Sequence, residues 1–167
     1  MGALDSWRFC PVCGEAIEKL DDRVECRACG NIAYANAVPG AEAVCLDDEG
    51  RILLGRRAFH PGKGLWDLPG GFLHEDEHPL DALRREVREE TALEIEPHEF
   101  LGFWLEPYDG RIVLCLAWTA GAQGAARPGD DLVELRWFRP DELPHSSELA
   151  FSHYSEVLSA ALRHEHP

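Results

Sequence analysis

The sequence predicts an α/β fold, in which a mixed sheet lies between helices and a small metal-held unit precedes it. Three observations predict this: two cysteine pairs near the N-terminus, a periodic acidic helix mid-chain, and apolar strand-like segments on both sides of that helix. The length of 167 residues suits one domain of ordinary size plus a small appendage. We therefore expect two domains, residues 1–36 and residues 37–167.

The N-terminal unit is predicted from two CxxC pairs, each followed directly by a glycine. Such knuckles hold Zn²⁺ tetrahedrally through four thiolates, which leaves no open coordination position and favours a structural role. A unit of this size has no adequate core without the metal. The predicted zinc ligands are Cys10, Cys13, Cys26 and Cys29.

The first strands of the larger domain are expected at Val38–Leu46 and Arg51–Arg57, with a turn at 47–50 between them. Arg56 and Arg57 end the second strand, and two interpretations of them stay open. One of them contacts a substrate phosphate, or both are charges that protect a sheet edge. Trp66, further on, is expected in the core.

A helix is expected from Pro79, since proline is well tolerated at the first helical position and Asp81 places negative charge in the first turn. Glu86, Glu89 and Glu90 stand at i, i+3 and i+4, so the helix gathers three carboxylates on one face. Carboxylates placed like this repel one another unless a hard cation such as Mg²⁺ or Mn²⁺ lies among them.

Further strands and a last helix are expected after this acidic helix. The loop after the long apolar strand is rich in Gly, Ala and Pro, and an amphipathic stripe marks the C-terminal helix, which Ser152 would cap. Cys45 and Cys115 lie in apolar, strand-like segments, so we expect them to be buried structural thiols. The expected elements are strands at 94–96, 100–105, 111–120 and 134–138, a hairpin turn at 108–110, and a loop at 121–131.

The net charge of −15 argues against non-specific binding to nucleic acid or to an anionic membrane. The chain has no apolar run long enough to cross a membrane, and its first residues lack the basic and apolar regions of a signal peptide. Two CxxC pairs point to metal binding in a reducing compartment rather than to disulfides. We therefore expect a cytoplasmic protein.

The acidic helix and the glycines before it resemble the Nudix hydrolase motif, Gly-x5-Glu-x7-Arg-Glu-aliphatic-x-Glu-Glu-x-Gly-aliphatic. One position differs, because alanine stands where the family has the glycine that ends the helix. Alanine adopts the left-handed conformation at a cost of roughly 1 kcal/mol, so neither the fold nor metal binding is affected. The matching residues are Gly71, Glu77, Arg85, Glu86, Val87, Glu89, Glu90, Ala92 and Leu93.

This resemblance implies a Nudix α/β/α sandwich that hydrolyses a nucleoside diphosphate linked to a further group, using Mg²⁺ or Mn²⁺. It implies that Glu86, Glu89, Glu90 and the Gly71 carbonyl hold the cation. It also implies that Arg85 orients these carboxylates, through Glu89 or Glu77, without touching substrate. The general base would be a glutamate of the motif or one on a later loop, for which Glu134 is the candidate.

The arrangement of a zinc ribbon before a Nudix domain resembles that of two groups within the family. NADH pyrophosphatases share the layout, but their Ser-Gln-Pro-Trp-Pro-Phe-Pro signature is missing around 104–108. Zinc-ribbon pyrophosphatases of ADP-ribose and FAD are similar at Gly62–Trp66, Asp141–Pro144 and Leu149–Ser152. The resemblance therefore points first to ADP-ribose or FAD. NADH, an NAD cap on RNA, and a non-catalytic nucleotide sensor remain as alternatives, and a homodimer is left open.

Overall fold

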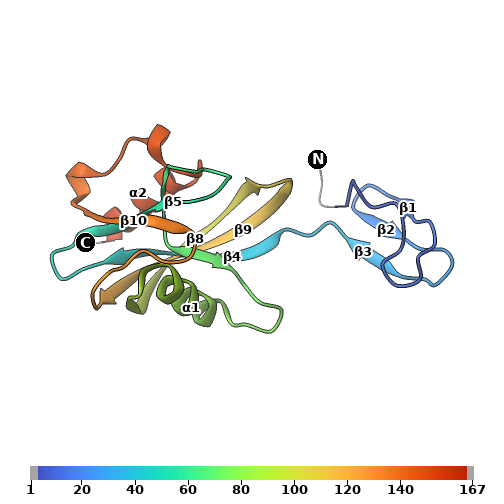
Figure 1. Cartoon of the computed structure of the whole chain (residues 1–167), viewed down its shortest axis with the longest axis horizontal. Coiled ribbons are helices and arrows are strands. Elements are labelled where there is room, and N and C mark those ends of the chain that lie inside the picture. Colours follow the sequence, from blue (N-terminus) through green and yellow to red (C-terminus); the bar gives the residue numbers. More distant parts are fainter. Residues whose placement is uncertain (1–3, 165–167) are drawn as a thin grey trace.

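The computed structural model describes residues 4–164 and contains two separate sheets. Figure 1 shows the small N-terminal sheet beside the larger body, joined to it by the chain around residues 35–37. The outer ends of the two expected domains, residues 1–3 and 165–167, lie outside the described residues. Within the described part, no helix is long and apolar enough to span a membrane.

The N-terminal sheet is antiparallel and consists of β1 (Glu18–Lys19), β2 (Arg23–Glu25) and β3 (Ile32–Tyr34) in that order. Each CxxC pair forms a tight loop that its glycine closes in the left-handed region, and in the second loop Gly30 (φ 75°) donates its N–H to the Cys26 carbonyl. The two loops bring the four cysteines together.

The larger sheet has seven strands, with the order β10-β5-β4-β9-β8, while β6 pairs with β5 and β7 pairs with β4. Strands β4 and β9 are parallel and the other neighbours are antiparallel, so the sheet is mixed, as predicted. Its strands are β4 (Val38–Leu46), β5 (Ile52–Arg57), β6 (Trp66–Asp67), β7 (Gly70–Phe72), β8 (Glu94–Tyr108), β9 (Arg111–Gln123) and β10 (Leu132–Phe138).

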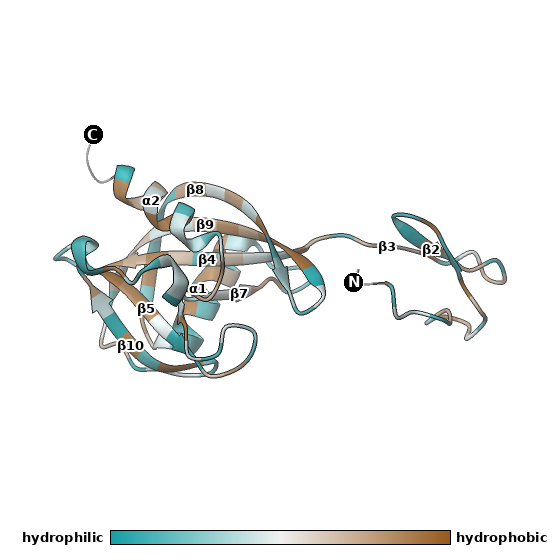
Figure 2. Cartoon of the chain, turned by 90° about the horizontal axis from the view of Figure 1, so that it is seen from above, coloured by the Kyte–Doolittle hydropathy of each residue, from teal (hydrophilic) through white to brown (hydrophobic). Residues whose placement is uncertain are grey.

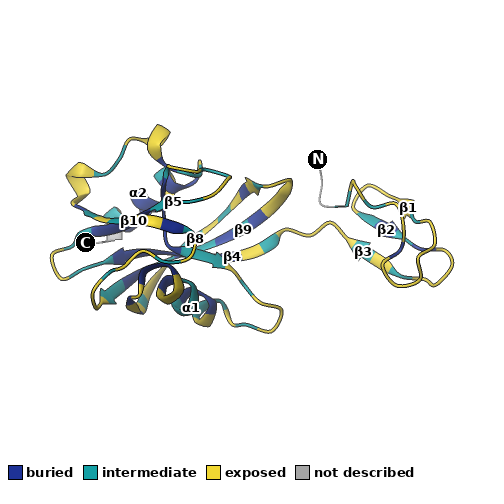
Figure 3. Cartoon of the chain, viewed as in Figure 1, coloured by how far each residue is buried: buried dark blue, intermediate teal, exposed yellow. Residues whose placement is uncertain are grey.

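Two helices cover opposite faces of this sheet (Figure 1): α1 (Pro79–Thr91) and α2 (Tyr154–His164). Side chains alternate between the faces along a strand, so Cys45 of β4 packs in the cluster with α1 and Val44 in the cluster with α2. Figure 2 shows the apolar colour along β5 and β9, and Figure 3 shows buried residues concentrated in the large sheet. The predicted α/β/α sandwich is confirmed.

A capping hydrogen bond marks the start of helix α1, and a left-handed residue marks its end. Its cap is His78, whose Nδ1 accepts a hydrogen bond from the Leu80 N–H (3.2 Å), and Pro79 occupies the first helical position. It ends at Ala92, which is left-handed (φ 58°, ψ 17°) and donates its N–H to the Arg88 carbonyl. The left-handed stop predicted at Ala92 is confirmed.

Three expectations about the later elements are wrong. A single strand, β8, replaces the two short strands expected at 94–96 and 100–105, and two register shifts accommodate the interruption. Strand β9 continues to Gln123, three residues into the expected loop. Ser152 does not cap α2, because its hydroxyl donates to Glu106 (2.8 Å) instead. Trp66, Cys45 and Cys115 are buried, as expected.

Candidate active site

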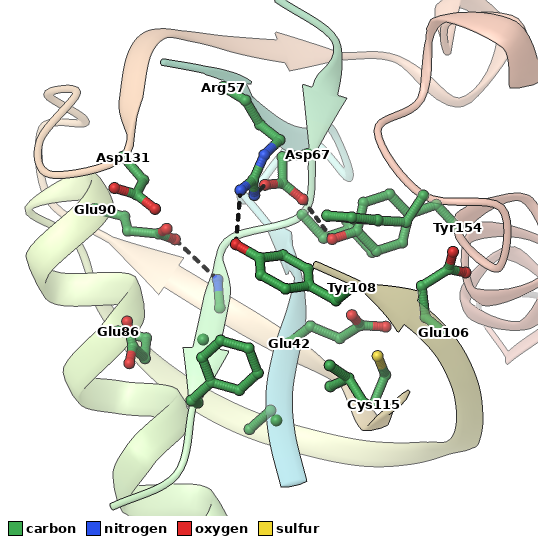
Figure 4. A pocket seen from close by; sticks show the side chains of 18 of the residues that line it. Glu42, Arg57, Asp67, Glu86, Glu90, Glu106, Tyr108, Cys115, Asp131 and Tyr154 are labelled. Carbon is green, nitrogen blue, oxygen red and sulfur yellow. Dashed lines mark hydrogen bonds and ion pairs between the residues drawn. The ribbon is translucent and has the colours of Figure 1, made fainter. Parts of the chain in front are cut away.

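A cavity of about 250 Å³ lies where β4, β7, α1 and the segment before α2 meet. Figure 4 shows carboxylates from α1 on one side of it and aromatic side chains on the other. Glu42 and Cys115 lie side by side at its floor, on the neighbouring strands β4 and β9 (Figure 4). The cavity thus combines acidic, aromatic and polar walls.

The acidic wall centres on Glu90 and Glu86, which lie on the inner face of α1. Glu90 is 5% exposed, and its Oε2 accepts a hydrogen bond from the Gly70 N–H (2.9 Å). Burial, with the negative charge of Asp67 next in importance, raises the pKa of Glu90 to about 9. Burial likewise raises the pKa of Glu86. Buried acids that are deprived of water in this way are suited to bind a cation.

The glycines before α1 let the backbone approach these carboxylates. A Cβ on Gly71 would overlap the carboxyl group of Glu86, and one on Gly70 would overlap the backbone of β4. Glycine at both positions therefore keeps β7 against β4 and leaves room for Glu86. The structure thus places Gly71 beside Glu86, on the lining of the cavity.

Arg85 connects the acidic side chains of the motif. Its guanidinium bonds both oxygens of Glu77 (2.7 and 2.8 Å), Glu86 Oε1 (2.7 Å) and Glu89 Oε2 (3.3 Å), and it donates to the Phe72 carbonyl (3.1 Å). The charge-assisted bonds from Arg85 lower the pKa of Glu77 to about 2. Neither Arg85 nor Glu77 lines the cavity. Arg85 contacts the cavity carboxylate of Glu86 from outside the lining, and Glu77 holds Arg85.

The structure does not bring all three helix glutamates into the cavity. The Glu89 side chain is 51% exposed, bonds to Arg85, and is absent from the cavity lining. Among residues 4–164, two groups place at least three possible ligand atoms within 4.8 Å of one another, and the motif carboxylates belong to neither. The first group is the four cysteines, and the second is Glu42, Cys115 and His153.

The two arginines of β5 have different environments. Arg57 lines the cavity, is buried, pairs with Asp67, and donates to the Tyr108 hydroxyl (3.3 Å). Arg56 stacks on the Trp66 ring (4.1 Å from its centroid). It also donates to Glu134 (2.8 Å), which lies opposite it on the neighbouring strand β10. Neither Arg56 nor Glu134 lines the cavity.

Sequence reasoning missed the polar floor of the cavity. His153 lies between two carboxylates, with Nε2 3.0 Å from Glu42 Oε1 and Nδ1 3.0 Å from Glu106 Oε2. Burial works to lower the pKa of His153, but hydrogen bonds with Cys115 and Glu42 outweigh it and raise the pKa to about 11. One signal was available, because Glu42 is a lone acid in an otherwise apolar strand segment.

The four N-terminal cysteines form the other possible metal site. The sulfur of Cys10 lies 3.6 Å from that of Cys29, and the sulfur of Cys13 lies 3.5 Å from that of Cys26. Tetrahedral zinc with bonds of about 2.3 Å separates its sulfur ligands by about 3.8 Å. The donor set and its spacing therefore fit a closed zinc site.

Comparison with known proteins identifies a match to the NUDIX domain model over residues 37–159. A crystal structure of a NUDIX hydrolase from Nitrosomonas europaea superposes with a TM-score of 0.78 at 25% identity, covering 96% of this chain and 94% of that one. This match extends over nearly all of the chain.

Two curated relatives carry more specific names. An NAD-capped RNA hydrolase NudC from Pseudomonas putida is 29% identical over 140 residues, which is 82% of this chain and 50% of the relative. An ADP-ribose pyrophosphatase from Methanocaldococcus jannaschii is 32% identical over 111 residues, which is 65% of this chain and 64% of the relative. The chain thus spans half to about two thirds of the length of these relatives.

Proposed function

Because the chain belongs to the NUDIX family, we propose that it hydrolyses the diphosphate bond of a nucleoside diphosphate linked to a further group, with ADP-ribose or FAD as the first candidates. The observation that carries the proposal is the position of Glu86 and Glu90 beside Gly70 and Gly71 on one wall of a cavity. The family to which the chain belongs consists of hydrolases, and one relative is named an ADP-ribose pyrophosphatase.

We propose Mg²⁺ or Mn²⁺ as the catalytic cation, held by Glu86, Glu90, Glu89 and the Gly71 carbonyl. The fit rests on oxygen donors whose burial raises the pKa of Glu86 and Glu90, so that a bound cation would relieve a real electrostatic cost. When bound, such a cation would neutralise charge on the diphosphate and would lower the pKa of a bound water, so that hydroxide is available near neutral pH.

The residues of the chain itself have distinct proposed tasks. Arg85 and Glu77 hold Glu86 and Glu89 in place from outside the cavity. Arg57, which lines the cavity and pairs with Asp67, is the arginine proposed to attract the diphosphate. For the general base, Glu86 and Glu90 of the motif line the cavity, whereas Glu134 is bonded to Arg56 outside it, which supports a motif carboxylate.

The N-terminal cysteines are proposed to hold a structural zinc ion, with residues 1–36 and 37–167 as separate folding units. The four sulfur donors fit a closed tetrahedral site, which has no position for a substrate. Free thiols that serve as metal ligands suit a reducing compartment, so we place the protein in the cytoplasm. Its proposed partners are small nucleotide conjugates, and a homodimer is compatible with this assignment.

The second candidate function is hydrolysis of NADH or of an NAD cap on RNA. Similarity to the NAD-capped RNA hydrolase over 82% of this chain favours it. The net charge of −15 and the missing signature at 104–108 weigh against it, because an acidic surface repels RNA. A nucleotide sensor without activity is a third alternative, although the motif carboxylates are all present.

A substrate panel tests the proposal. ADP-ribose, FAD, NADH and an NAD-capped RNA are incubated with the protein in Mg²⁺ or Mn²⁺, and phosphate is measured after an added phosphatase. We expect metal-dependent turnover, fastest with ADP-ribose or FAD, which the Glu90→Gln variant loses. Preference for the capped RNA would select the second function, and turnover at background for every compound would favour the sensor.

A further inference from the structure

The floor of the cavity contains a second group of metal-ligand side chains, which the proposed hydrolysis does not use. Glu42 of β4, Cys115 of β9 and His153, which precedes α2, place one ligand atom each within 4.8 Å of one another. They are 6%, 7% and 5% exposed, and all three line the cavity. The donors are therefore shielded from bulk water on all sides except that of the cavity.

The surroundings of His153 fix the direction of its ring. Nδ1 lies 3.0 Å from Glu106 Oε2, and the Ser152 hydroxyl donates to the same oxygen (2.8 Å). This leaves Nε2 directed at Glu42, 3.0 and 3.1 Å from its two oxygens. A carboxylate behind an imidazole, which orients the other ring nitrogen, is the usual arrangement around a metal-binding histidine.

We propose that Glu42, Cys115 and His153 bind a zinc ion whose remaining coordination position faces the cavity. A thiolate combined with an imidazole and a carboxylate selects zinc over Mg²⁺ or Mn²⁺, which prefer oxygen ligands. Zinc bonds of about 2.0 Å to nitrogen and oxygen separate these atoms by roughly 3.3 Å in a tetrahedron, close to the separation present between Nε2 and Glu42.

Charge also supports the zinc ion. Two buried carboxylates, those of Glu42 and Glu106, and the Cys115 thiol surround a single imidazole. Zinc binding would release the proton of the thiol, and the divalent charge would offset the acidic groups around it.

Zinc stoichiometry of the full chain tests this proposal. Metal-free protein is reconstituted with zinc, desalted in excess Mg²⁺ to keep zinc off the motif carboxylates, and analysed by mass spectrometry of the metal. We expect about two zinc ions per chain, one of them in the four-cysteine site, and about one in Cys115→Ser and in His153→Asn. The matched control, Cys45→Ser, removes a buried thiol outside the cluster and should keep two.

Cobalt titration of the unaltered chain gives a second measurement that needs no variant. We expect two equivalents to bind, with the four-thiolate absorption from one and a weaker thiolate absorption, typical of a mixed donor set, from the other. Saturation after one equivalent, with a purely four-thiolate spectrum, overturns the proposal. Two zinc ions retained in Cys115→Ser and His153→Asn also overturn it, because the second ion would then lie elsewhere.

Discussion

The three glutamates on one face of α1 occupy three different environments. Glu90 is buried and accepts a backbone hydrogen bond, whereas Glu86 is paired with Arg85. Glu89 is about half exposed. Helical spacing sets which face they share, but the depth of each depends on how α1 packs against β7.

Replacing Glu90 or Glu89 with glutamine should abolish most turnover without unfolding the chain. Glutamine has almost the same size and helix propensity, so the fold should persist, while one negative charge disappears from the proposed metal shell. We expect kcat on the best substrate to fall at least about a hundredfold, which is roughly 3 kcal/mol of transition-state stabilisation. The measurement is kcat at saturating Mg²⁺, with circular dichroism to verify folding.

The control for this experiment is Glu94→Gln, just beyond the motif. Glu94 is exposed and bonds to Arg88 (2.6 and 2.8 Å), and exposed pairs of this kind contribute little to stability. Its variant should keep normal kcat. If folded Glu89→Gln and Glu90→Gln proteins also keep it, the metal site lies elsewhere and the proposed mechanism is wrong.

The raised pKa of Glu90 predicts a pH-dependent gain in stability for Glu90→Gln without metal. An unfolded glutamate ionises near pH 4.3, whereas burial holds folded Glu90 protonated up to about pH 9. Folded protein thus binds more protons between these values, and its stability falls as pH rises through them. The melting-temperature gain of the variant should be small at pH 5 and larger at pH 8, measured in chelator. An equal gain at both values contradicts the assignment.

At the scale of elements, the sequence predicted the bounds of a strand or helix where residues at its own ends determine them. Strand β4 has the expected bounds, and α1 begins at the expected Pro79. The continuity of β8 was not predictable in this way, because Pro97 interrupts the pattern and cannot donate a hydrogen bond to the sheet. Register shifts opposite β9 accommodate it, and they depend on a partner strand that the local sequence does not reveal.

Ala92→Gly tests the end of α1. Ala92 is exposed and left-handed, a conformation that costs a residue with a Cβ more than it costs glycine. We expect the free energy of unfolding to increase by up to roughly 1 kcal/mol, measured by chemical denaturation. Ala92→Val, which adds a branched side chain in the same conformation, should decrease it. A decrease in both variants contradicts the prediction.

At the scale of the whole molecule, the cavity joins residues that are far apart in the sequence. Glu42 and His153 are separated by 111 positions, and Arg57 meets Tyr108 across 51. Spacing within one segment predicted the carboxylate wall, because a helix places i, i+3 and i+4 together. The polar floor arises only once β4, β9 and the segment before α2 pack, so no local pattern could reveal it.

The N-terminal unit has almost no core of its own. Among residues 4–36, the structure buries Cys10, Val24 and Cys26, while Phe9 and Val12 are 68% and 71% exposed. Two of the three buried residues are proposed zinc ligands. The metal therefore has to supply the stability that hydrophobic burial supplies in the larger domain.

Cys26→Ser should unfold this unit and leave the larger domain folded. Serine does not replace a thiolate in a four-sulfur site, and losing the ion removes the contact that holds both CxxC loops. The larger sheet has its own core on both faces, so its thermal transition and some turnover should remain. The measurements are zinc content, which should fall by about one ion per chain, limited proteolysis within residues 4–36, and kcat.

The control, Ala28→Ser, alters a non-ligand position in the same loop and should keep both zinc and protease resistance. A Cys26→Ser protein that lacks this zinc, yet stays protease-resistant throughout residues 4–36, would show that the unit folds without the metal.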